Sequence, residues 1–305
     1  MQVILGANGV IAKELSKLLP RYTNQIRQVS RHPQRVNVTD ELLTADLCDY
    51  NQTERAIEGC DVAYLVAGLK YDIKVWRKDW PVIMQNVMDA CARHNCKLIF
   101  FDNVYAYGHV DGVMTESTPF NPNSRKGEVR AAIATRLLEA IKSGNINGAI
   151  VRAADFYGPD AALSIPHIGV FERLPAGKTP QWIGDPKKIH TFTYTPDAAR
   201  TLALVGNTPA AINQTWHAVT SKEKMTGQEF IRIATTILNL PPGKILSLGK
   251  TTLRLVGLFE PVLREFVEMM YQFDADYVFD STKTEKTLGI APSSYYDGIN
   301  EILVG

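Results

Sequence analysis

The feature that most constrains this chain is an alternation of short apolar runs with helical patterns over its first 152 residues. The apolar runs predict strands at residues 2–5, 26–29, 61–66, 97–101 and 146–152, with a third strand in chain order inside 42–47. The helical patterns lie between them, at residues 10–19, 51–58, 80–94 and 128–142. Strands that alternate with helices predict an α/β fold, with a doubly wound parallel sheet. Parallel strands are buried on both faces, which explains why these runs are continuously apolar.

The turn after the first predicted strand carries the pattern GxxGxxA, in residues 6–12. Gly6 permits a tight turn, Gly9 lets the backbone approach a pyrophosphate, and Ala12 lets helix and strand pack closely. The helix that begins there offers free N–H groups and a positive dipole end to phosphates. The alternative is an ordinary turn with two glycines. The placement between a strand and a helix favours a Rossmann-type dinucleotide site.

The end of the second predicted strand bears on the choice between NAD and NADP. A carboxylate in this position binds the ribose 2′-hydroxyl of NAD, but the chain reads Val29-Ser30-Arg31-His32. Ser30 and Arg31 offer a hydroxyl and a planar cation, which suit a 2′-phosphate. We therefore predict NADP as the cofactor, in preference to NAD. The alternative is that Arg31 is a solvated surface charge.

Beyond residue 152 the pattern changes, because prolines interrupt the chain repeatedly between Pro159 and Pro196. A strand is predicted at residues 213–220 and a helix at 226–238. There is no Ser/Gly linker between the halves. We predict a dinucleotide-binding domain at residues 1–155. A smaller, irregular substrate-binding part at 156–305 would lend elements to the main sheet.

Composition excludes several classes of protein. The 33 Lys and Arg residues nearly balance 32 Asp and Glu residues, so we expect no nucleic-acid partner. The chain has no leader pattern and no uninterrupted apolar span of about 18 residues, which predicts a cytoplasmic protein without a membrane partner. The four cysteines form no CxxC pair, and no histidine accompanies them at ligand spacing. Free thiols and no metal site are predicted.

Further segments match a known family along nearly the whole chain. They are Asp46-Leu47, residues 59–68, Asn86-Val87, and residues 103–108, 151–159, 192–199 and 280–289. With the glycine loop, they resemble the extended short-chain dehydrogenase/reductase family, also called the NAD-dependent epimerase/dehydratase family. The resemblance implies that Asp46 faces the adenine, and that Val66, Ala67 and Gly68 line the cofactor. It also implies a homodimer through the helices at 80–94 and 128–142.

The loop, the strand ends and the resemblance together define the candidate cofactor-binding residues. These are Gly6, Asn8, Gly9, Val10, Ile11, Ser30, Arg31, Asp46, Leu47, Val66, Ala67, Gly68, Asn86 and Arg130.

The chain departs from the family at the catalytic centre. The family uses Ser or Thr followed by Tyr-x-x-x-Lys, and the matching positions here are Asn103, Lys126 and Arg130. No tyrosine occurs between Tyr107 and Tyr157, so no shift of the alignment recovers the missing one. The resemblance therefore describes an atypical member.

The substitutions suggest a changed proton chemistry. Arg130 can still bind ribose hydroxyls, because it has five donors. It lies one helical turn from Lys126, so we expect the two cations to face each other and to favour a neutral Lys126 able to exchange protons. Asn103 and Lys126 could also stabilise an oxyanion. Tyr105 and Tyr107, in the loop after the fifth predicted strand, are further candidates for proton transfer, and local packing is their alternative role.

Residues 69–80, rich in Trp, Tyr and charges, are expected to form a loop that binds substrate or covers the core. Two functions remain for the whole chain. The first is an NADP-dependent oxidoreductase or epimerase acting on a small carbonyl or nucleotide-sugar-type substrate, and the substrate half favours this enzyme. The second is a non-catalytic NADP-binding redox sensor or regulator, which the altered centre favours.

Overall fold

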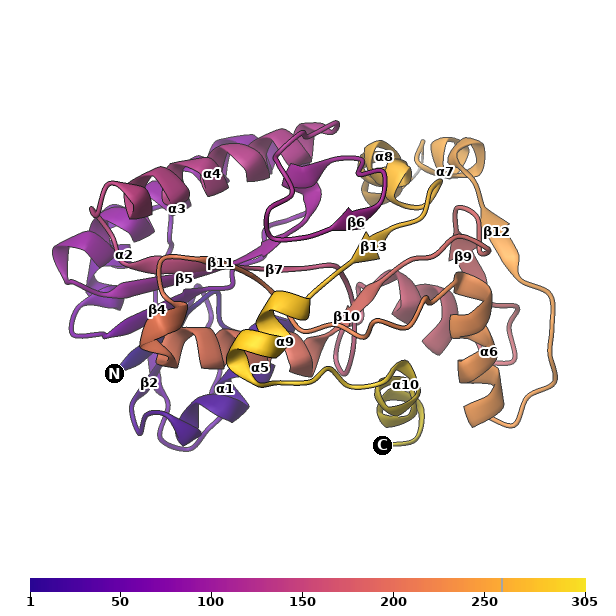
Figure 1. Ribbon diagram of the computed structural model, residues 1–305, viewed down its shortest axis with the longest axis horizontal. Coiled ribbons are helices and arrows are strands. Elements are labelled where there is room, and N and C mark those ends of the chain that lie inside the picture. Colours follow the sequence, from indigo (N-terminus) through magenta and orange to yellow (C-terminus); the bar gives the residue numbers. More distant parts are fainter. Residues whose placement is uncertain (259) are drawn as a thin grey trace.

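The computed structural model describes residues 1–258 and 260–305, and its centre is a seven-stranded parallel sheet (Figure 1). The strands are β1 (Gln2–Leu5), β2 (Ile26–Ser30), β3 (Glu41–Thr44), β4 (Val62–Leu65), β5 (Lys97–Asn103), β7 (Gly148–Ala153) and β11 (Thr215–His217). Their order across the sheet is β11-β7-β5-β4-β1-β2-β3. The order turns back at β1, which defines a doubly wound sheet and confirms the predicted fold class.

Helices cover both faces of the sheet (Figure 1). One face carries α2 (Tyr50–Ile57), α3 (Ile73–Arg93) and α4 (Arg125–Lys142), and the other carries α1 (Val10–Leu18) and α5 (Thr195–Asn207). Successive side chains of β1 point alternately to the two faces of the sheet, so they pack against different helices. Val3 and Leu5 pack in the core beneath α3 and α4, whereas Ile4 packs against α1 and α5.

The second half builds a smaller body at one end of the sheet (Figure 1). Its paired strands are β8 (Asp155–Tyr157) with β10 (Phe192–Tyr194) and β9 (Gln181–Ile183) with β12 (Leu246–Leu248), and its β13 (Val278–Phe279) pairs with β6 (Val113–Met114) of the first half. Its helices are α6 (Gly227–Ile237), α7 (Lys250–Val256), α8 (Pro261–Phe266), α9 (Thr282–Leu288) and α10 (Tyr295–Val304). Short helical turns are η1 (Leu19–Arg21), η2 (Tyr105–Tyr107), η3 (His167–Phe171), η4 (Pro209–Ala211) and η5 (Val267–Gln272).

This smaller body has an apolar core of its own, which includes Tyr157, Trp182, Phe230 and Tyr295. It also contributes β11, which pairs with β7 at the edge of the main sheet.

Two helices begin several residues before their predicted starts. Helix α3 begins at Ile73 rather than at residue 80, because Asp72 caps it by accepting a hydrogen bond from the Lys74 amide at 2.8 Å. The predicted loop at residues 69–80 is therefore mostly helix. Its tryptophans, Trp76 and Trp80, are buried in the core. Helix α4 likewise starts earlier than predicted, after the Ser124 cap.

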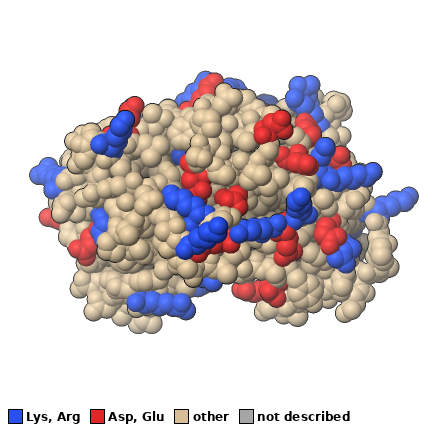
Figure 2. Space-filling model, viewed as in Figure 1, with Lys and Arg blue, Asp and Glu red and all other residues tan. Residues whose placement is uncertain are grey.

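The described helices include none that is both long enough and apolar enough to cross a membrane. On the face drawn in Figure 2, basic and acidic side chains lie intermingled, which agrees with the formal charge of +1.

Candidate functional site

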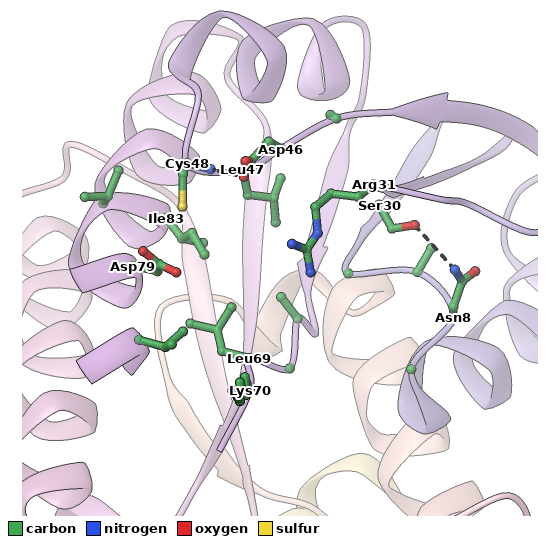
Figure 3. A pocket seen from close by; sticks show the side chains of 18 of the residues that line it. Asn8, Ser30, Arg31, Asp46, Leu47, Cys48, Leu69, Lys70, Asp79 and Ile83 are labelled. Atoms are coloured by element: carbon green, nitrogen blue, oxygen red, sulfur yellow. Dashed lines mark hydrogen bonds between the residues drawn. The ribbon is translucent and has the colours of Figure 1, made fainter. Parts of the chain in front are cut away.

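A cavity of about 960 Å³ opens at the carboxyl ends of β1, β2 and β4 (Figure 3). Its walls come from five segments: the glycine loop, the end of β2, the segment after β3, the loop after β4 and the first turns of α3. Ligand pockets have volumes of roughly 300–1,000 Å³, so this cavity is large enough for an extended ligand.

Position 6 requires glycine because of both its backbone conformation and its close neighbours. Its φ of +99° lies in the left-handed region, and a Cβ built on it would lie 2.3 Å from the Cα of Ala67. Gly9 caps α1, and no side chain satisfies the N–H groups there. The backbone at the start of α1 is thus free to donate to a phosphate, as the glycine pattern predicts.

Asn8 connects the glycine loop to the segment after β2. Its side chain donates to the His32 carbonyl oxygen at 2.6 Å and accepts from the Gln34 amide at 3.0 Å. The Arg31 side chain is exposed and points into the cavity, beside Ser30 and across from Asp46 (Figure 3). This arrangement places a guanidinium and a hydroxyl where the sequence predicts the 2′-phosphate.

The cavity wall includes many of the predicted cofactor residues but not all of them. Those that line it are Gly6, Asn8, Gly9, Ser30, Arg31, Asp46, Leu47, Ala67 and Gly68. Those outside its lining are Val10, Ile11, Val66, Asn86 and Arg130. The Asn86 side chain donates to the Leu47 carbonyl oxygen at 2.9 Å, so its contact is with the 46–48 segment. A role in cofactor binding stays a prediction for all of these residues.

The structure adds to the cavity wall Lys70, Lys78 and Asp79, which the sequence did not count among the cofactor-binding residues but which lie in the segment 69–80 that was expected to bind substrate or cover the core. Lys78 and Asp79 lie on the part of α3 that was expected to be a loop. The signal that could have found them is Asp72, because aspartate is a common helix cap. A helix that starts after Asp72 turns Val75, Lys78 and Asp79 toward the same side, which is the side of the cavity.

The second cluster of interest lies where α4 begins and centres on Lys126, which is fully buried. Its Nζ donates to Glu265 Oε2 at 2.5 Å, to Glu268 Oε1 at 2.8 Å and to the Glu265 carbonyl oxygen at 3.1 Å. Its charge also lies 4.5 Å from the centre of the Tyr71 ring. We call Glu265 and Glu268 the carboxylate clasp.

The carboxylate clasp is anchored at further points. Glu265 Oε2 accepts from the Ile73 amide at the start of α3, and Glu268 Oε2 accepts from the amide and Nε of Arg125. Burial by itself would raise the pKa of Glu268. The hydrogen bonds and charge of Lys126, together with Arg125, lower that pKa below its ordinary value. The clasp thus holds α8 and η5 against the start of α3 and α4.

Arg130 does not face Lys126, which corrects the expectation of two opposed cations. Its guanidinium forms an ion pair with Asp102 at 2.5 Å and lies 4.5 Å from the Trp80 ring centre. The side chain is only 4% exposed, so its hydrogen bonds are made within the protein. Each cation has carboxylate partners of its own, which removes the repulsion on which the neutral Lys126 was argued. The ribose contact predicted for Arg130 stays untested.

The remaining catalytic candidates, Asn103, Tyr105 and Tyr107, differ in the contacts that their side chains already make within the protein. The Asn103 side-chain oxygen accepts from the Tyr105 amide at 3.0 Å. The Tyr107 hydroxyl lies 2.8 Å from His217 Nε2 and accepts from Arg152 at 3.2 Å. Burial lowers the pKa of His217 to about 3, so the ring is neutral, and its Nδ1 lies 2.7 Å from the Asp280 carbonyl oxygen, which requires the proton there and leaves Nε2 an acceptor for Tyr107. Tyr107 is therefore held in an internal network, whereas Tyr105 stacks on Trp76.

Comparison with known proteins identifies the family. A sequence model of the NAD dependent epimerase/dehydratase family matches residues 2–218, and the chain belongs to that family. The membership confirms the predicted family and agrees with the prediction that the chain is an enzyme. A comparison with curated protein sequences gives no match.

Solved structures share the fold at low sequence identity. A double mutant of DesIV, a dTDP-glucose 4,6-dehydratase from Streptomyces venezuelae with NAD and DAU bound, is 18% identical with a TM-score of 0.81; 99% of this chain and 95% of that one are covered. UDP-glucose 4-epimerase from Thermotoga maritima with UDP-glucose is 16% identical with a TM-score of 0.81, covering 99% and 97%. The dTDP-glucose 4,6-dehydratase of Bacillus anthracis in complex with NAD is 14% identical with a TM-score of 0.82, covering 99% and 94%.

Proposed function

We propose that this protein is an NADP-dependent oxidoreductase or epimerase that acts on a nucleotide sugar or a related small carbonyl compound. The observation that carries the proposal is the cavity between the glycine loop and Arg31. Its walls combine a loop that only glycine can form, free N–H groups and a cation. This set of groups suits the phosphates of a dinucleotide.

The choice of NADP rests on the end of β2. Ser30 and Arg31 line the cavity there, and the segment bears no carboxylate. The solved structures that share the fold include proteins with NAD, so a preference for NADP would be a property of these residues. When bound, the nicotinamide would supply or accept a hydride. The chain would hold the pyrophosphate at the start of α1 and the 2′-phosphate at Arg31.

The proposed substrate class rests on the family and on the nucleotide sugars named for its structural neighbours. Those neighbours act on dTDP-glucose or UDP-glucose. The smaller body adjoins the carboxyl edge of the sheet at β8 and α8, which is the edge where open α/β sheets bind ligands. We therefore expect a sugar ring at this edge.

The experiment is a calorimetric titration with NADP and NAD, followed by a turnover screen against nucleotide sugars, ketones and aldehydes. The proposal predicts tighter binding of NADP and conversion of at least one nucleotide sugar. Binding without turnover across the panel would instead support the alternative, a redox sensor or regulator. The structural feature that favours this alternative is the carboxylate clasp on Lys126. Failure of both nucleotides to bind would contradict both functions.

Two further properties belong to the proposal. We expect a homodimer through α3 and α4, which analytical ultracentrifugation would detect as a doubled mass. We also expect a cytoplasmic protein, since its four cysteines are free thiols and suit a reducing compartment. The division into parts at residues 1–155 and 156–305 likewise remains a proposal.

A further inference from the structure

Asp155 and His190 form a buried pair at the carboxyl edge of the sheet. Asp155 is the first residue of β8, two positions after Ala153, which pairs in register with Asn103 of β5. Its Oδ2 lies 3.0 Å from His190 Nε2. The His190 side chain is 2% exposed, but that of Asp155 is 20% exposed. The carboxylate therefore joins a buried ring to the open side of the edge.

The hydrogen bonds of His190 determine how many protons the pair holds. The other ring nitrogen, Nδ1, lies 3.2 Å from the carbonyl oxygen of Gln272. Both partners are oxygen acceptors, so satisfying both contacts requires a proton on each ring nitrogen or a proton on the Asp155 carboxyl. When both contacts are hydrogen bonds, the pair carries one proton more than a neutral histidine beside a carboxylate.

Aromatic rings fix the histidine in place. His190 stacks on Phe273 at 4.3 Å and on Tyr277 at 4.4 Å, nearly parallel to each. Such packing leaves the ring little freedom to rotate, so Nε2 stays directed at Asp155. A proton held this way can leave the pair through the partly exposed carboxylate.

Tyrosine side chains lie near the pair, and the ring of one of them, Tyr277, stacks on His190. Burial raises the pKa of Tyr71, Tyr105, Tyr271 and Tyr277, and the charge of Asp155 adds to the increase in all four. Among the described residues, the buried hydroxyls of Tyr71, Tyr271 and Tyr277 make no hydrogen bond of good geometry, and only polar neighbours such as Tyr105, Ser124 and Gln272 lie close to them. A buried polar group without a well-placed partner is unfavourable. Three such hydroxyls in this region are available to a ligand rich in hydroxyl groups.

We propose that Asp155, positioned by His190, gives and takes the substrate proton at this edge. The inference rests on the proposed function and names the proton donor that Lys126, bound by its clasp, does not supply. The substrate would be a secondary alcohol or its ketone on a sugar ring. Its neighbouring hydroxyl groups would bind Tyr71, Tyr271 and Tyr277.

The proposed step conserves atoms and electrons in both directions. In the reducing direction, the ketone carbon gains two electrons as a hydride from the reduced dinucleotide, and the ketone oxygen gains the proton of the pair. The ketone becomes an alcohol, and the pair is left as a neutral histidine and a carboxylate. Solvent returns a proton to the exposed carboxylate. In the oxidising direction, the alcohol O–H gives its proton to the pair as its carbon gives up the hydride.

Asp155→Asn tests the role directly, because asparagine keeps the shape but cannot carry the proton. A general acid–base contributes about 10²–10⁴-fold, so we expect kcat to fall about 100-fold or more. His190→Asn should lower kcat with little change in KM, as a positioning residue would. NADPH affinity, measured by calorimetry, should be unchanged in both variants. The matched control is Glu172→Gln, which removes a carboxylate facing His167 elsewhere and should leave kcat unchanged.

The protonation of the pair can be read without turnover. In wild-type protein at neutral pH, ¹⁵N and ¹³C spectra should show His190 with both nitrogens protonated or Asp155 with a protonated carboxyl. A singly protonated ring beside an ionised Asp155 overturns the proposal, even if Asp155→Asn fails to fold. An active wild type whose Asp155→Asn variant keeps its kcat overturns the role of the pair alone. A wild type that binds NADPH but converts no substrate overturns the proposed function and this role together.

Discussion

The cofactor cavity and the carboxyl edge near Lys126 are neighbouring regions built in opposite ways. The cavity is open and is formed by short, local motifs: a glycine loop, the end of one strand and the start of one helix. At the edge, Lys126 is buried and bound to Glu265 and Glu268, and the polar groups come from segments far apart in the chain. The difference suggests that dinucleotide binding and proton transfer depend on separate sets of residues.

The largest effect is expected from Gly6→Ala, which would disrupt the cofactor cavity and not the edge near Lys126. The new Cβ would lie 2.3 Å from the Cα of Ala67, in a residue whose φ is +99°. We expect a loss of about 3 kcal/mol or more in unfolding free energy, and no measurable NADPH binding. Chemical denaturation and calorimetry measure the two quantities.

The control for that variant is Gly9→Ala in the same loop. Its Cβ would lie 3.6 Å from the Gly6 carbonyl oxygen, an ordinary contact. It should preserve stability and weaken NADPH binding only. If Gly6→Ala were as stable as Gly9→Ala, the close approach of the loop to Ala67 would be wrong.

Removing the carboxylate clasp should affect the edge and spare the cavity. In Glu265→Gln/Glu268→Gln, Lys126 would stay buried without a compensating charge, which costs about 3–5 kcal/mol. Thermal and denaturant unfolding would show this loss, while NADPH affinity at the cavity should persist under folding conditions.

Glu229→Gln provides the control for the clasp variant, because the Arg232–Glu229 pair is exposed and lies on α6, away from the helices of the proposed dimer. An exposed pair contributes about 0–1 kcal/mol, so its loss should be small. Equal effects of the clasp and control variants would show that the Lys126 cluster is not a buried ion cluster.

A smaller effect should follow from Arg31→Ser. A hydrogen bond to a charged group contributes about 1.5–3 kcal/mol, so NADPH affinity should fall about tenfold or more. NADH affinity should be unchanged, because NADH lacks the 2′-phosphate. Arg35→Ser, in the same loop but outside the cavity lining, is the matched control. A loss of affinity that is equal for both nucleotides would refute the assignment of Arg31.

The smallest effect concerns pH. The folded-state pKa of Glu268 lies below its ordinary value of 4.5, so its contribution to stability is complete above that value. The contribution is lost as pH falls through the lowered folded-state pKa. The stability difference between wild type and Glu268→Gln should therefore shrink in acid. A difference that stayed constant from neutral pH into acid would contradict the ion pair with Lys126.

The same contrast explains how far sequence reasoning reached. The sheet and the glycine loop follow from local patterns, in which neighbouring residues carry the whole signal. The clasp joins Lys126 to residues 139 and 142 positions later, and the Asp155–His190 pair spans 35 positions. Such contacts leave no spacing rule in one sequence. The like-charge argument for Lys126 was wrong for this reason, since its partners were not visible.

Calorimetric titration with NADPH of wild type, Arg31→Ser and Asp155→Asn tests the separation of the two regions most directly. The account predicts saturable binding to wild type, weaker binding to Arg31→Ser, and binding to Asp155→Asn that equals wild type. If Asp155→Asn lost affinity while Arg31→Ser kept it, the two regions would have been assigned the wrong way round.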